Sequence, residues 1–108
     1  MIAMLWFIYC EDRDDGAAAI RAAVREEHLA YLEAHEEIMV LGGALIADDA
    51  VARLGSVFLV NLPGRAACDA LMLDEPFRKA GLFKRVTIAR MRKGQFNPNA
   101  APATAEGD

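Results

Sequence analysis

His28 and Asp74 are the two side chains of this sequence that are best suited to proton-transfer chemistry. His28 lies in a segment, residues 20–35, whose apolar and aromatic residues recur every three or four positions, which predicts a helix with one inward face. An imidazole titrates near neutral pH. On an inward face it is therefore either a satisfied core residue or the acid or base of a buried site. The residue type alone leaves both interpretations open.

Asp74 follows an apolar segment, residues 65–73, and precedes Pro76 by two positions. Taken alone it is a solvated residue at the end of a helix, although the helix dipole disfavours a carboxylate there and a specific partner would explain it better. Two predicted helices that pack side by side would bring Asp74 near the first helix. An aspartate that accepts a hydrogen bond from one ring nitrogen would fix the tautomer of His28 and raise its basicity. We therefore expect a His28–Asp74 pair.

Three further residues are candidates for contacts with a small ligand. Ser56 begins a predicted strand and can offer a hydroxyl, although serine is also a common small residue at a strand start. It lacks the sharp strand-to-helix turn that presents a catalytic serine. Gly43 permits close backbone approach, but no phosphate-binding glycine pattern follows it. Tyr31 shares the inward face of His28.

Neither a metal ion nor another cofactor is expected. His28 and His35 lie two helical turns apart, ~10 Å along the helix axis, which is too far to share one ion. Cys10 and Cys68 are too few and too far apart for a zinc site or a disulfide framework. Each sits among apolar residues, which predicts two buried free thiols.

The composition sets limits on the class of protein. A chain of 108 residues is one small domain that dimerisation would help to stabilise. The net charge is −4 without a basic cluster, which argues against binding to nucleic acid. The apolar start is short, lacks the features of a signal peptide, and no stretch approaches the ~20 apolar residues of a membrane helix. A cytoplasmic protein that does not bind membranes is expected.

The order of apolar runs and of glycine or proline breaks predicts a βαββαβ fold. The expected strands are residues 3–10, 38–47 with a bulge at Gly42-Gly43, 54–62 and 83–91, and the expected helices are residues 14–37, 65–73 and a short turn at 76–81. This is the ferredoxin-like α+β arrangement, in which a four-stranded antiparallel sheet carries both helices on one face. The strands are apolar on both sides, so a second copy is expected to cover the other face. Residues 1–95 form the predicted domain and residues 96–108 a flexible tail.

Five short motifs in register resemble the YCII-related (YciI-like) family of the dimeric α/β-barrel superfamily. They span most of residues 1–95 and lie at residues 25–32, 41–45, 54–57, 74–77 and 80–83. The resemblance implies a homodimer through the sheet faces, a pocket between sheet and helices, and an active site at His28 and Asp74 with Ser56 nearby. Two departures stand out. The family often has Asp-Pro, whereas Glu75 separates Asp74 from Pro76, and the family often has Gly-Pro where Ala44 follows Gly43.

The leading hypothesis is a small enzyme that uses His28 as general acid or base, oriented by Asp74, on a small organic or aromatic-derived substrate. The resemblance implies chemistry of the lyase, isomerase or dehydrochlorinase type. The alternative is a non-catalytic module on the same dimeric barrel that binds or senses a small ligand. A haem or quinol oxygenase fits less well, because haem would need an axial ligand from His28 or His35. A carboxylate and a cavity beside His28 would favour the enzyme.

Overall fold

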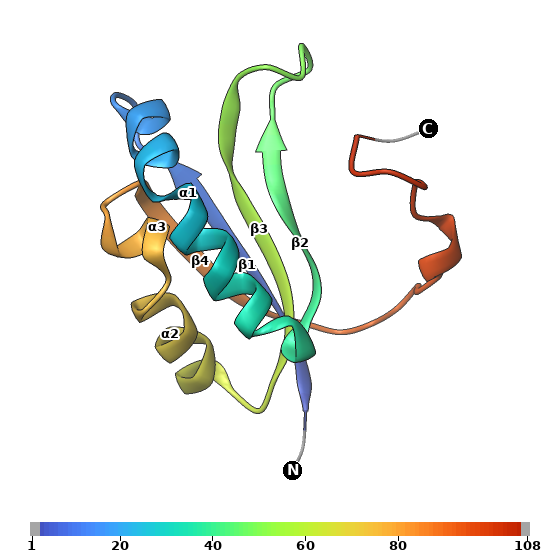
Figure 1. Ribbon diagram of the computed structural model, residues 1–108. Coiled ribbons are helices and arrows are strands. Elements are labelled where there is room, and N and C mark those ends of the chain that lie inside the picture. Colours follow the sequence, from blue (N-terminus) through green and yellow to red (C-terminus); the bar gives the residue numbers. More distant parts are fainter. Residues whose placement is uncertain (1–2, 107–108) are drawn as a thin grey trace.

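The computed structural model describes residues 3–106 (Figure 1). Positions 1–2 of the predicted domain and 107–108 of the predicted tail therefore lie outside the described residues. The elements in chain order are β1 (Met4–Asp12), α1 (Ala17–Ala34), the 3₁₀ turn η1 (Glu36–Ile38), β2 (Met39–Ile46), β3 (Arg53–Leu62), α2 (Arg65–Leu73), α3 (Pro76–Lys79), β4 (Phe83–Met91) and the 3₁₀ turn η2 (Pro98–Ala100).

The four strands form one antiparallel sheet in the order β2-β3-β1-β4. The helices cover one face of this sheet (Figure 1). The predicted ferredoxin-like α+β fold is therefore confirmed. β1 is an interior strand, and its backbone pairs with β3 on one side and β4 on the other along nearly its whole length.

Alternation along the strands divides the side chains between the two faces of the sheet. The face under the helices holds the core, whose fully buried members include Ile8, Cys10, Val60, Cys68 and Met72. Both cysteines are free and buried, as predicted. The opposite face, called here the open face, carries other apolar residues of all four strands: Leu5, Phe7, Tyr9, Leu41, Val57, Leu59 and Met91. No helix of the described residues covers it (Figure 1).

Several details of the elements differ from the sequence expectation. α1 ends at Ala34 and a 3₁₀ turn follows, because His35 leaves the helical conformation with φ −114° and ψ 20°. β1 continues to Asp12, two residues beyond its apolar run. The expected bulge at Gly42-Gly43 is wrong: both glycines pair regularly with β3, and the register shifts occur on either side of them, between Met39 and Leu41 and between Leu45 and Ile46.

The connection from α2 to β4 brings a short helix against α1. Pro76 begins α3, since proline lacks the N–H that a first helical residue does not need. Gly81 ends the connection with φ 79°, a left-handed conformation that glycine adopts at no steric cost. α1 and α3 pack directly on each other, so the residues at the start of α3 face the middle of α1. No helix within residues 3–106 is long and apolar enough to cross a membrane.

Candidate active site

The carboxylate partner of His28 is Glu75, not the expected Asp74. Nδ1 of His28 is hydrogen-bonded to Oε1 of Glu75. Their side chains are 10% and 1% exposed, so water contributes little to the pairing. A carboxylate is only an acceptor when it is ionised, and Nδ1 then carries the proton. This leaves the lone pair of His28 on Nε2.

Glu75 is held from a second direction. It stands at the N-cap of α3, where its Oε2 accepts a hydrogen bond from the backbone N–H of Arg78 at 2.9 Å. The N-terminal end of a helix favours a negative charge, although a helix as short as α3 supplies only a small dipole. The carboxylate is thus fixed by α1 through His28 and by α3 through its backbone, and it has little freedom to turn.

Two phenylalanines fix the plane of the imidazole. The ring of Phe77 stacks on His28 with centroids 3.8 Å apart and planes 15° apart. Phe58, on β3, lies 6.3 Å away in a tilted arrangement. Both phenylalanines are nearly fully buried. Glu75 therefore holds the Nδ1 edge of the imidazole and Phe77 holds the plane of the ring. Together they fix the direction in which Nε2 points.

Nε2 of His28 makes no hydrogen bond within residues 3–106. Every buried side-chain nitrogen and oxygen of that range has a hydrogen-bond partner. Nε2 is therefore not a buried atom, and the small exposed part of the ring includes this nitrogen. A fixed imidazole with one occupied and one accessible nitrogen is the arrangement that general acid–base catalysis requires.

A second polar group lies next to this pair. Arg21, on α1, donates two hydrogen bonds to the buried carboxylate of Asp12 at 2.8 and 2.9 Å. It also donates to the Gly55 carbonyl at 3.2 Å and lies 3.5 Å from Ser56 Oγ. Its guanidinium is 5.1 Å from the centroid of the Phe77 ring. Ser56 is thus buried and held by Arg21, and Phe77 contacts both Arg21 and His28.

The other residues expected at the site are placed differently. Asp74 is exposed at the C-terminal end of α2 and makes no side-chain hydrogen bond in the described structure. The Tyr31 hydroxyl donates to the Leu71 carbonyl at 2.7 Å and so joins α1 to α2. Burial raises the pKa of Tyr31, and the nearby charges of Asp74 and Glu75 raise it further. Gly43 pairs with Val57 and lines a cavity over the open face, away from His28.

Cys10 lies under the site but is not a nucleophile. It is fully buried on β1, opposite Ser56. Burial raises the pKa of its thiol to about 12, with a further contribution from the charge of Glu75. The thiol therefore stays protonated at neutral pH, and thiolate chemistry at this position is not expected.

Sequence reasoning missed Glu75 and Arg21, and both carried a signal. Glu75 directly precedes Pro76, and an acidic residue before a proline is typical of a helix N-cap followed by proline at the first helical position. Arg21 was expected on the outer face of the helix. It precedes His28 by seven residues, however, and two turns of helix place such residues on the same side.

Three of the larger cavities around the described residues are lined by residues other than His28. Two lie over the open face and measure about 1000 and 840 Å³. The third, of about 260 Å³, lies between α1 and α3 and is lined by Val24, Glu27, Pro76, Lys79 and Ala80. Of these three cavities, the small one comes nearest to His28 along α1, since Val24 lies one helical turn before it.

The chain was compared with known proteins. The family model described as the YCII-related domain matches residues 4–92. Among solved structures, the chain is similar to 5-chloro-2-hydroxyhydroquinone dehydrochlorinase (TftG) from Burkholderia phenoliruptrix AC1100, in complex with 2,5-dihydroxybenzoquinone. The two are 29% identical with a TM-score of 0.75, over 82% of this chain and 94% of that one. The search of curated proteins gave no match.

The family match covers the residues that form the site. The matched range includes β1, α1, β3 and α3, and with them His28, Glu75 and Phe77. It ends one residue after β4. The match covers well over half of the chain, and the chain belongs to the family of YCII-related domains.

Proposed function

We propose that the protein is a small enzyme that performs general acid–base chemistry with His28 and Glu75, of the lyase, isomerase or dehydrochlorinase type. The observation that carries the proposal is the fixed imidazole, whose Nδ1 is bonded to a buried carboxylate and whose Nε2 is accessible. Glu75 takes the orienting part that the sequence had suggested for Asp74. His28 is the catalytic residue and Glu75 is a positioning residue.

The pair would act in the following way. Nε2 takes a proton from a hydroxyl or C–H group of the substrate. The imidazolium that forms is stabilised by the ionised carboxylate of Glu75, which is already in place and needs no reorganisation. In a dehydrochlorination, the substrate loses this proton and a chloride ion, so no oxidant, reductant or other cofactor is needed. The stacked Phe77 ring keeps the imidazole from turning while it carries the charge.

The comparison supports a small hydroxylated ring compound as the class of substrate. The similar solved structure is a dehydrochlorinase that holds a dihydroxybenzoquinone. The surroundings of His28 are aromatic, because Phe77 and Phe58 line the ring from the protein side. Both phenylalanines are buried, so they hold the imidazole in place and leave its exposed edge to meet a planar substrate.

The test is turnover of chlorinated hydroxyhydroquinones, followed by chloride release and by the absorbance of the quinoid product. His28→Gln and Glu75→Gln are expected to lower kcat/KM by about 10²-fold or more, the usual contribution of a positioned acid or base. Asp74→Asn is the matched control, since it neutralises the adjacent, exposed carboxylate. Full activity of Glu75→Gln, or a loss with Asp74→Asn alone, would overturn the assignment.

The alternative, a non-catalytic ligand-binding module, is favoured by one observation. The two larger cavities lie over the open face, and neither is lined by His28. Calorimetric titration with 2,5-dihydroxybenzoquinone separates the two functions. Binding that is unaffected by His28→Gln, without turnover of any chlorinated analogue, would favour the module over the enzyme.

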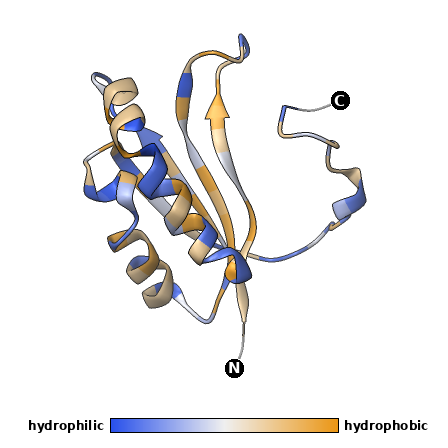
Figure 2. Cartoon of the chain, in the orientation of Figure 1, coloured by the Kyte–Doolittle hydropathy of each residue, from blue (hydrophilic) through white to orange (hydrophobic). Residues whose placement is uncertain are grey.

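The proposal also includes a homodimer formed through the open faces. Leu41 is 68% exposed there, and Phe7 and Met91 are also exposed. Figure 2 shows hydrophobic residues along β2 and β3, although no helix covers their outer side. A contiguous apolar surface of this kind is typical of an interface. Sedimentation analysis of the wild type and of Leu41→Glu tests the dimer, since a charge buried in the interface should dissociate it.

A further inference from the structure

The chain beyond the matched family domain forms a segment, residues 93–106, that we call the C-terminal arm. It leaves β4, passes the foot of the sheet and rises beside β2, on the side away from the helices (Figure 1). All of its residues are exposed. The arm lies outside the family match, which ends at residue 92. Neither the fold nor the His28 site accounts for it.

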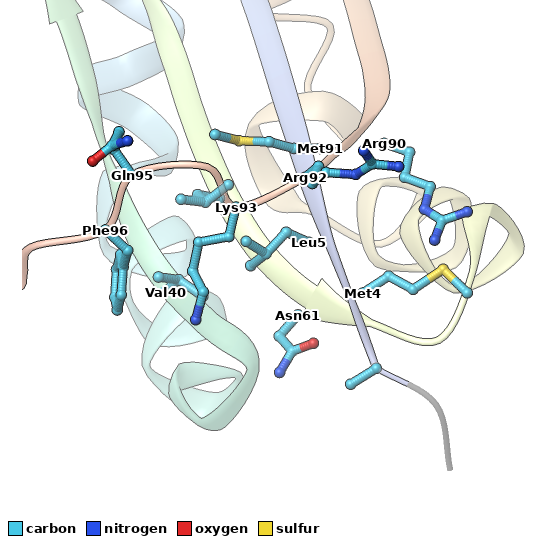
Figure 3. Close-up of a pocket in the computed structure, with 12 residues that line it drawn as sticks. Met4, Leu5, Val40, Asn61, Arg90, Met91, Arg92, Lys93, Gln95 and Phe96 are labelled. Atoms are coloured by element: carbon cyan, nitrogen blue, oxygen red, sulfur yellow. The ribbon is translucent and has the colours of Figure 1, made fainter.

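The arm stands off the open face and leaves two hollows between itself and the sheet, both open to solvent. A cavity of about 840 Å³ separates Phe7, Tyr9 and β2 from residues 101–106. A second cavity, of about 1000 Å³, separates Leu5 and Leu59 from Gln95 and Phe96 of the arm (Figure 3). Within residues 3–106, the arm thus lies at a distance from the apolar face of the sheet and does not pack onto it.

Short-range contacts give parts of the arm a local structure. Phe96 is 58% exposed and lies under the ammonium group of Lys93, which is 4.9 Å from the ring centroid. Asn97 caps η2 by accepting a hydrogen bond from the backbone N–H of Asn99. Pro98 and Pro102 restrict the backbone further. A segment that is ordered beforehand loses less entropy when it binds, and an exposed aromatic residue is a common interface anchor.

The open face alone is small for a stable dimer interface. Strands of eight to ten residues, at ~3.3 Å per residue and ~4.8 Å between strands, give a face of ~600 Å² per protomer. Two such faces bury ~1,200 Å² in total, which is the lower limit for a stable interface. A dimer held by the sheets alone would therefore be marginal, and two arms would add the area that is missing.

We propose that a second copy of this chain fills the space between sheet and arm, and that each arm clasps the partner protomer. Phe96 is the anchor of the clasp. The inference rests on the sheet-face dimer of the proposed function and deepens it. It assigns a role to residues 93–106 that is independent of the chemistry at His28.

The experiment uses the full chain with a photoreactive phenylalanine analogue at position 96 or, as a control, at Leu73. Leu73 is 68% exposed on α2, far from the open face, and is therefore a matched exposed apolar residue. Irradiation should produce a covalent dimer from position 96 and none from position 73. Sedimentation should show that Phe96→Ala weakens the dimer about tenfold or more, which corresponds to ~1.4 kcal/mol, while Leu73→Ala leaves it unchanged.

Each outcome decides a separate point. Cross-links from position 96 that stay within one chain, together with an unchanged dimer in Phe96→Ala, would overturn the clasp. The sheet-face dimer would still stand if Leu41→Glu dissociates it. A wild-type chain that is monomeric at all concentrations would overturn both the clasp and the dimer. The acid–base assignment is judged separately, by chloride release from the His28 and Glu75 variants.

Discussion

Replacing Glu75 should have two separable consequences, one for stability and one for the tautomer of His28. Glu75→Ala removes the N-cap of α3, which costs about 1 kcal/mol. It also leaves Nδ1 of His28 without its partner in a buried position, which costs about 1–3 kcal/mol. The expected loss in the free energy of unfolding is therefore about 2–4 kcal/mol.

Glu75→Gln should keep the fold and change the chemistry. The single amide oxygen of the glutamine would accept from the Arg78 backbone N–H, as Oε2 of Glu75 does now. Its NH₂ group would then face Nδ1 of His28, which must become an acceptor. The proton moves to Nε2, so the accessible nitrogen can no longer take a proton. The cost in stability should be only about 1 kcal/mol, because both hydrogen bonds are preserved in number.

Urea unfolding at a fixed protein concentration measures the first consequence, and ¹⁵N NMR of the imidazole measures the second. A loss of 2–4 kcal/mol would move the urea midpoint by about 1–2 M for a domain of this size. Asp74→Ala is the matched control and should stay within about 0.5 kcal/mol of the wild type, since its side chain is exposed. A wild-type stability for Glu75→Ala, or a proton that stays on Nδ1 in Glu75→Gln, would refute the reasoning.

Three further predictions concern the residues around the site. Gly55→Ala should lower the free energy of unfolding by about 3 kcal/mol, because the added Cβ would meet the Cys10 carbonyl oxygen at 2.1 Å. Gly43→Ala is the control: its Cβ would meet nothing within 4 Å, so this variant should fold normally. Thermal melts of both variants compare them. Cys10 and Cys68 should not react with a thiol reagent at pH 8 until the protein unfolds, since both are buried and burial raises the pKa of each thiol; rapid labelling of the native protein would contradict this. Tyr31→Phe should cost about 1 kcal/mol, as it removes a hydrogen bond that joins α1 to α2, and an unchanged urea midpoint would argue against it.

The sequence was sufficient for the fold but not for the partner of His28. Hydrophobic periodicity places α2 and β4 at their observed bounds, and it puts His28 on the inward side of α1. The choice between Asp74 and Glu75, however, depends on one backbone rotation. The residue before a proline avoids the helical region, and Glu75 is extended with φ −67° and ψ 125°. Asp74 is still helical, with φ −98° and ψ −1°. With the backbone extended at Glu75, the Glu75 side chain lies against α1, whereas the side chain of Asp74 stays in solvent.

Arg21 was misplaced for a different reason. Charged residues are expected outside, and Arg21 was assigned to the outer face on that basis. Its buried partner, Asp12, lies in the extension of β1 beyond the apolar run, which sequence patterning did not include in the strand. Once β1 reaches Asp12, a carboxylate stands under the first turns of α1, and Arg21 pairs with it. Such long-range partners depend on strand length and are outside the reach of local periodicity.

The pair formed by His28 and Glu75 bears on the question whether His28 is a core residue or a functional one. A buried imidazole–carboxylate pair loses the hydration of both groups, and apolar residues of similar volume often replace such pairs at no cost in stability. The surrounding core already contains phenylalanines in contact with His28, so an apolar residue would fit the composition of the site. Stability therefore gives little reason to keep a titratable pair here. A role in proton transfer, which uses a fixed tautomer and an accessible Nε2, is such a reason. The pair therefore favours a functional histidine over a core histidine.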